Sequence, residues 1–229
     1  MSPNKLILLS FALILPAAMF AGQLDTFPTW NGVDTIGDIG YPDTSTYGEA
    51  ITTPAGAGSV DDFSFWLSVP VGFQFQAFIS PWDNINYQLT GSPLYLSSVV
   101  TATDAGLDEY TFTGVNATAI PGVIYQFGVT INNVYGNDST IGTGVMGGDF
   151  ESNGNSTNYF DWNNDGGNNT LLYQNWNNTG CADNGGACGQ ARFVVDYSAG
   201  TGVPEPGTFA LLGLALLPLV KIQRRPSKR

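Results

Sequence analysis

Short apolar runs separated by turn-forming residues are the feature that most constrains the fold of this 229-residue chain. In residues 73–79, Phe73, Phe75 and Ala77 alternate with polar neighbours, and a period of two is typical of a β-strand. No helical periodicity is found between residues 23 and 200. Many short strands with Gly, Asn, Asp and Pro between them predict an all-β, jelly-roll-like β-sandwich. Further strands are expected at residues 62–67, 94–100, 109–113, 123–131, 159–162, 171–173 and 191–197.

The part of the chain between its two apolar ends has about 180 residues, enough for one domain with a sizeable core. We expect the β-sandwich domain to cover residues 49–200. Residues 22–48 are rich in Gly and Asp, and we expect them to form an irregular N-terminal arm or entry strand. Large inward side chains are needed in a sandwich of this size, so Phe65 and Trp66 are expected in the core.

Both ends of the chain carry an apolar segment whose flanking residues are typical of a sorting signal. Lys5 precedes an apolar run over residues 6–20, and Ala21 and Gly22 offer a small-residue cleavage point. This layout predicts a signal peptide over residues 1–21, with an uncleaved anchor as the alternative. The second segment, residues 209–220, would rise about 18 Å as a helix, against about 30 Å for a bilayer core. It is a short membrane span, or alternatively a buried helix that closes the domain.

The flanks of the second segment favour the membrane interpretation. Proline on both sides of Glu205 favours an extended peptide, which the cleft of a processing enzyme can accept. Basic residues follow the apolar segment and no acidic residue does, which favours a C-terminus that stays in the cytoplasm. The proline motif consists of Val203, Pro204, Glu205 and Pro206, and the basic stop of Lys221, Arg224 and Arg225.

This ordered arrangement over residues 201–229 resembles the C-terminal sorting signal of PEP-CTERM proteins. The resemblance implies exosortase as a partner, cleavage near Glu205, and a precursor held in the inner membrane by its C-terminal helix. It also implies a mature form at the cell surface or in the exopolysaccharide matrix of a biofilm-forming Gram-negative bacterium. Cys181 and Cys188, the two cysteines of the chain, are expected to pair as a loop disulfide in such an exported protein.

Charge and composition exclude several function classes. Residues 23–202 contain 18 acidic residues and one basic residue, Arg192, which gives a net formal charge of −17. Such a body should repel nucleic acid. The same residues contain no histidine and no lysine, which removes the usual general base, the serine–histidine pair and the Schiff-base lysine. We therefore expect no enzymatic activity. A glycoside hydrolase is the alternative: Glu49, Glu109, Glu151 and many aspartates are available as its two carboxylates, but no spacing picks out a pair.

Carbohydrate binding is the sharper non-catalytic hypothesis, against a purely structural or adhesive matrix role. The chain contains an ordered set of motifs: Ser64-Phe65-Trp66-Leu67, residues 75–79, Trp82-Asp83, residues 91–97, Tyr110-Thr111-Phe112 and residues 122–125. This set resembles a β-sandwich ectodomain common among PEP-CTERM proteins, similar in outline to the jelly rolls of carbohydrate-binding modules. Trp82 and Trp176 lie in polar, loop-like sequences and are the candidates for exposed platforms for sugar rings, whereas a core position is the commoner one for any single tryptophan.

Calcium is the one cofactor that the sequence suggests. Asp161, Asn163 and Asp165 occupy positions 1, 3 and 5 of an EF-hand-like loop, with Gly166 at position 6. Leu172 stands at position 12, where a bidentate glutamate belongs, and no flanking helices are expected. An Asn-Asp-Gly turn between two strands is the alternative.

Overall fold

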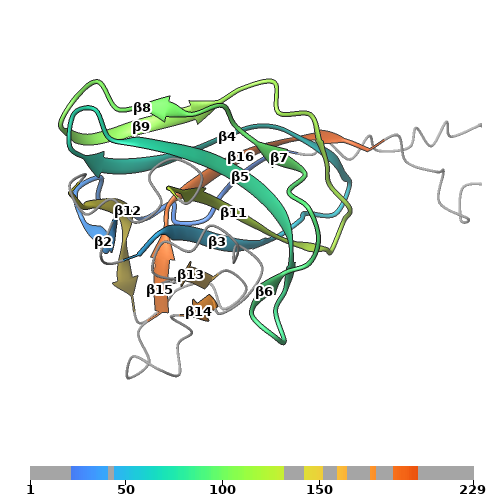
Figure 1. Ribbon diagram of the computed structural model, residues 1–229. Coiled ribbons are helices and arrows are strands. Elements are labelled where there is room, and N and C mark those ends of the chain that lie inside the picture. Colours follow the sequence, from blue (N-terminus) through green and yellow to red (C-terminus); the bar gives the residue numbers. More distant parts are fainter. Residues whose placement is uncertain are drawn as a thin grey trace, which may run out of the picture.

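The structure, a computed structural model, describes residues 22–40, 44–131, 142–151, 159–163, 176–178 and 188–200. In these ranges the chain is all-β and contains no helix. Its strands form two antiparallel sheets, which pack as a β-sandwich (Figure 1). The all-β sandwich expected from the sequence is therefore confirmed.

The first sheet has eight strands within the described ranges. Five of them follow the order β1 (Gln23–Asp25), β16 (Phe193–Ala199), β4 (Ala57–Val69), β12 (Gly144–Glu151) and β15 (Cys188–Ala191). The other three pair with members of this row: β2 (Thr35–Ile39) with β12, and both β9 (Gly106–Phe112) and β10 (Ala117–Thr118) with β4.

The second sheet also has eight strands in the described part of the chain. Their order is β14 (Trp176–Asn178), β13 (Tyr159–Asn163), β3 (Thr46–Thr52), β11 (Ile124–Thr130), β5 (Gln74–Asp83) and β6 (Gln88–Leu89). Two more short strands, β7 (Tyr95–Leu96) and β8 (Val100–Thr101), pair with β5.

The core lies between the two sheets and is rich in phenylalanine. On β4, Phe63 and Phe65 point inward, at 1% and 0% exposure, because they are two residues apart. Both rings stack on Phe112 of β9, with centroid distances of 5.1 and 5.6 Å. On β5, Phe75 is fully buried in the same core. Burying each such side chain stabilises the fold by about 1.5–3 kcal/mol.

Most expected strands are found, with shifted ends. Residues 62–67 and 109–113 lie mainly in β4 and β9, and residues 123–131 coincide with β11. Residues 94–100 form only the short β7 and the start of β8. The strand expected at 171–173 lies outside the described residues.

Of the two forms expected for residues 22–48, the structure shows the entry strand rather than a loose arm, in the part of this segment that it describes. β1 pairs with β16, β2 pairs with β12, and Thr46 already begins β3. The glycines that suggested irregularity serve close packing: Gly37 has φ +67°, and a Cβ there would collide with the ring of Tyr47. Local composition was overridden by cross-strand pairing.

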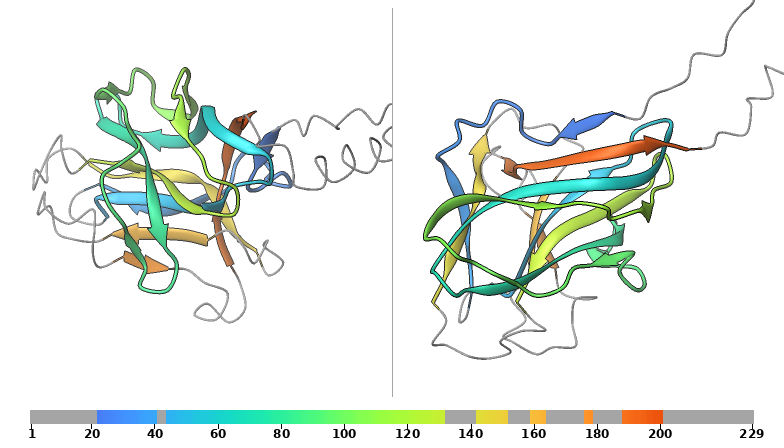
Figure 2. Two further views of the ribbon diagram at one scale, coloured as in Figure 1. Left: turned by 90° about the vertical axis from the view of Figure 1, so that its right-hand side faces the viewer. Right: turned by 90° about the horizontal axis from the view of Figure 1, so that it is seen from above.

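The chain enters and leaves the sandwich at the same place. β1 and β16 are antiparallel neighbours with Gln23 opposite Asp196, and Tyr197 N donates to Gly22 O at 3.3 Å. The right-hand view of Figure 2 shows the blue start of β1 beside the orange end of β16. Residues 22 and 200 therefore lie at one end of the first sheet.

The described residues include no helix long and apolar enough to cross a membrane. The signal peptide expected over residues 1–21 and the sorting signal expected over residues 201–229 both lie outside the described ranges.

Candidate functional site

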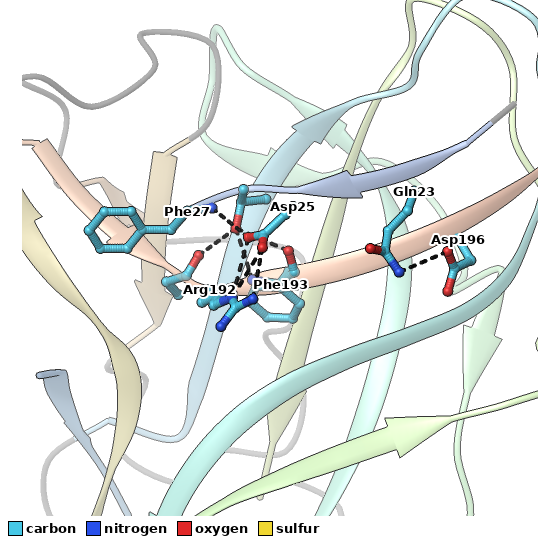
Figure 3. Close-up of polar contacts among 8 residues, drawn as sticks. Gln23, Asp25, Phe27, Arg192, Phe193 and Asp196 are labelled. Atoms are coloured by element: carbon cyan, nitrogen blue, oxygen red, sulfur yellow. Dashed lines mark hydrogen bonds and ion pairs between the residues drawn. The ribbon is translucent and has the colours of Figure 1, made fainter. Parts of the chain in front are cut away.

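Arg192, which lies between β15 and β16, forms an ion pair with Asp25 at the end of β1 (Figure 3). Its Nε and Nη2 donate to Asp25 Oδ2 at 3.2 and 2.9 Å. Asp25 Oδ1 also accepts a hydrogen bond of 3.0 Å from Phe27 N. The two side chains are 26% and 21% exposed, so the pair is largely sheltered from solvent. The ion pair fastens the first strand to the last.

Two tryptophan rings complete this group, which we call the arginine cluster (Asp25, Trp30, Trp66 and Arg192). The guanidinium carbon lies 4.4 Å from the centre of the Trp66 ring and 5.6 Å from that of Trp30. The two rings are 5.5 Å apart. Phe193 pairs with Phe65, and this register places Arg192 beside Trp66 on the outer face of the first sheet. The core position expected for Trp66 is therefore wrong, whereas Phe65 is fully buried as predicted.

The contacts of the arginine cluster stabilise the first sheet. The guanidinium is bound by a carboxylate on one side and covers the Trp66 ring on the other. Trp30 is 9% exposed and donates its indole N–H to Asp34 O at 2.9 Å. Because Arg192 is paired with Asp25 and covers the Trp66 ring, this group stabilises the fold, and the guanidinium takes up the ring face that a ligand would need.

Trp82, predicted as an exposed sugar platform, is 6% exposed. It packs with Ala50, Phe78 and Leu89 in a second hydrophobic cluster. Because β5 continues to Asp83, Leu89 of β6 pairs directly with Trp82 and covers it. The prediction of an exposed Trp82 is therefore wrong.

Three other predicted site residues lie on neighbouring strands of the second sheet. In the backbone register, Asn163 of β13 is opposite both Trp176 of β14 and Thr46 of β3, and Asp161 is opposite Gly48. The register thus brings Asp161, Asn163 and Trp176 to adjacent positions. Asp165, the third proposed calcium ligand, lies outside the described residues.

The remaining predicted residues are only partly within the described ranges. Cys188 begins β15 opposite Glu151, and its expected partner Cys181 lies outside them. The sorting residues are also outside: Val203, Pro204, Glu205, Pro206, Lys221, Arg224 and Arg225.

Of the glutamates considered for hydrolysis, Glu49 and Glu109 have described side chains, and these two do not face one another. Glu49 is 0% exposed, points between the sheets, and accepts a hydrogen bond of 3.0 Å from Ala191 N. Glu109 is exposed on the outer face of the first sheet, opposite Trp66. Packed sheets lie about 10 Å apart, so a sheet layer separates the two groups. The sequence signal for the burial of Glu49 is its alternation with Tyr47 and Ile51, both of which are buried.

The turn between β5 and β6 is polar, as its sequence indicates, and the structure adds the hydrogen bonds that order it. Asp83 Oδ2 accepts from Asn86 Nδ2 at 2.7 Å, and Oδ1 accepts from the backbone N–H groups of Ile85 and Asn86 at 2.8 and 3.1 Å. The Asn86 amide first, and then these two N–H groups, lower the pKa of Asp83 below its ordinary 3.8. Tyr87 follows with φ +48° and is 43% exposed, the one exposed aromatic side chain in the described part of the chain.

Comparison with known proteins found no relative: no family model matches the chain, and no curated protein or solved structure shows significant similarity to it.

Proposed function

We propose that this chain is the precursor of an exported, non-catalytic β-sandwich protein. Exosortase cuts it near Glu205, after an N-terminal signal has led it through the inner membrane. The mature domain then resides at the cell surface or in the exopolysaccharide matrix of a Gram-negative bacterium, where it binds carbohydrate. The sequence signals at the two ends support the route.

The observation that carries the proposal is the pairing of the first strand with the last. Because Gln23 lies opposite Asp196, an export signal before residue 22 and a membrane-held tail after residue 200 leave from the same end of the domain. Both can therefore engage one membrane while the sandwich is folded. The three residues from Gly200 to Val203 span at most about 11 Å, which sets the cleavage region close to the folded sheet.

Two further observations support parts of this proposal. The chain crosses between the sheets at each step from β3 through β4, β5, β9, β11 and β12 to β13, as a jelly-roll form of the sandwich would require. The separation of the buried Glu49 from the exposed Glu109 supports a domain without paired catalytic carboxylates.

Substitution of the proline motif tests the sorting part of the proposal. In a host with exosortase, Glu205→Ala combined with Pro204→Ala should leave the tail attached and keep the protein in the membrane fraction. Thr201→Ala, two residues before the motif, serves as the matched control and should be processed like the wild type. Normal release of the motif variant would refute exosortase processing at this site.

A further inference from the structure

Exposed apolar side chains gather along one edge of the second sheet. Of the eight large apolar side chains that are exposed in the described residues, five lie between residues 85 and 99. We call these five the β5 edge strip: Ile85, Tyr87, Leu94, Leu96 and Val99, which are 43–86% exposed. A concentration of this kind marks an interaction surface more often than scattered single residues do.

The strip is continuous because three short strands cover the same edge of β5 in succession. Asp83 pairs with Gln88 in β6, Phe78 with Leu96 in β7, and Gln74 with Thr101 in β8. Six of the ten residues of β5 pair in this way, and the pairs are spread over the whole strand, which is about 34 Å long. The exposed apolar side chains are therefore carried by segments that follow one long strand.

The tip of the strip is held in a fixed and strained conformation. The three hydrogen bonds to Asp83 and the bond of 3.4 Å from Trp82 Nε1 to Asn84 Oδ1 order the turn. Tyr87 has φ +48°, a left-handed conformation that Gly and Asn adopt more readily than tyrosine. Its ring is 43% exposed, so burial in the core does not explain why a tyrosine is placed there. Strain of this kind at an exposed aromatic residue points to a binding role.

Charge decides what the strip can bind. No charged residue occurs between Asp83 and Asp104, although residues 23–202 have a net formal charge of −17. A second copy of the chain, an anionic lipid surface or an acidic polysaccharide would bring negative charge against this acidic body. A neutral sugar chain would bring no such charge, and it offers apolar C–H faces to the exposed ring of Tyr87.

We propose that the β5 edge strip binds a neutral polysaccharide, with Tyr87 as its main aromatic contact. The inference rests on the proposed function, because it assumes that the domain resides among extracellular glycans. It places the sugar platform at Tyr87, five residues beyond the buried Trp82. Leu94 and Leu96 extend the contact along the strand, which suits a polymer better than a single sugar.

Native affinity electrophoresis of the mature exported protein tests this proposal. Gels would contain hydroxyethyl cellulose, laminarin, dextran or galactomannan as neutral probes, and alginate as the acidic comparison. We expect at least one neutral polymer, and not alginate, to retard the wild type. Tyr87→Asn should weaken that retardation at least tenfold while the melting temperature stays equal or rises, because asparagine tolerates the positive φ.

Leu96→Thr and Val33→Thr form a matched pair for the same gels. Leu96 lies on the strip, whereas Val33 is 73% exposed before β2 of the first sheet, so only Leu96→Thr should weaken retardation, by a few-fold. Absence of retardation on all four neutral polymers, or equal retardation of Tyr87→Asn, would overturn the proposal. A dimer in sedimentation that Tyr87→Asn dissociates would also overturn it, in favour of self-association. The intact mass of the same samples shows whether the tail has been removed, so a failure of polysaccharide binding is distinguished from a failure of exosortase processing.

Discussion

Asp25 and Arg192 join the first strand of the sandwich to the last, with Arg192 Nη2 2.9 Å from Asp25 Oδ2. We expect Arg192→Lys to lower the free energy of unfolding by about 1–2 kcal/mol. Lysine keeps the charge but loses the paired N–H donors of the guanidinium and its stacking on Trp66. Urea unfolding measures the change. Gln23→Ala, which removes an exposed hydrogen bond to Asp196 on the same two strands, should cost less than about 0.5 kcal/mol. Equal losses in the two variants would contradict the special role of Arg192.

Tyr197 should make the fold sensitive to alkali. Burial first, and then the neighbouring Tyr125, raise the pKa of Tyr197 well above its ordinary 10.0. The folded state therefore prefers the protonated phenol. The stabilisation that follows from this preference is complete below pH 10 and is lost as the pH rises above that value.

Among the described residues, the hydroxyl of Tyr197 has no hydrogen-bond partner. Tyr197→Phe should therefore change stability by less than about 1 kcal/mol at pH 7. Above pH 10 the variant should lose less stability than the wild type in a pH series of urea unfolding, and identical alkaline losses would argue against this assignment.

Gly128 of β11 should not accept a larger side chain. A Cβ at this position would lie 2.5 Å from Phe78 Cζ and would also contact the carbonyl oxygen of Tyr47. We expect Gly128→Ala to destabilise the fold by about 1–3 kcal/mol through overpacking. Gly22→Ala, at a position with open space, is the matched control and should be nearly neutral in thermal unfolding. A neutral Gly128→Ala would show that β5 and β11 are packed less closely than described.

The calcium prediction is tested by metal removal. If Asp161, Asn163 and Asp165 bind Ca²⁺, calcium at 100 times its Kd should stabilise the fold by about 2.7 kcal/mol, and chelator should reverse the gain. Asp161→Asn should abolish the response, whereas Asp104→Asn, an exposed change elsewhere, should preserve it. A melting temperature that is the same in calcium and in chelator would remove the metal site.

Period-two alternation predicted the centre of the fold well. Phe73, Phe75 and Ala77 point into the core as expected, because strand geometry alone sends every second side chain to one face. The alternating pattern does not predict what covers the outward face of β5. Phe78 and Trp82 face outward from β5, and both are buried because a second cluster that includes Leu89 packs over them. That cover comes from a hairpin whose pairing could not be inferred from local sequence.

Long-range pairing explains the other differences. Gly and Asp in residues 22–48 suggested irregular structure, yet β1 pairs with β16, 169–173 residues away in sequence, and β2 pairs with β12, 105–112 residues away. The arginine cluster depends on the same register, because Trp66 and Arg192 meet only when β4 and β16 pair. The exposure of Tyr87 could not be predicted, because it follows from the hydrogen bonds to Asp83 that order the turn, which the sequence does not display.

The intact mass of the native, mature protein tests the central claim most directly. Exported protein purified from its own host should begin near Gly22 and end between Val203 and Gly207, with the apolar segment and the basic stop removed. A mature form that still carries residues 209–229 would contradict exosortase processing and the function built on it.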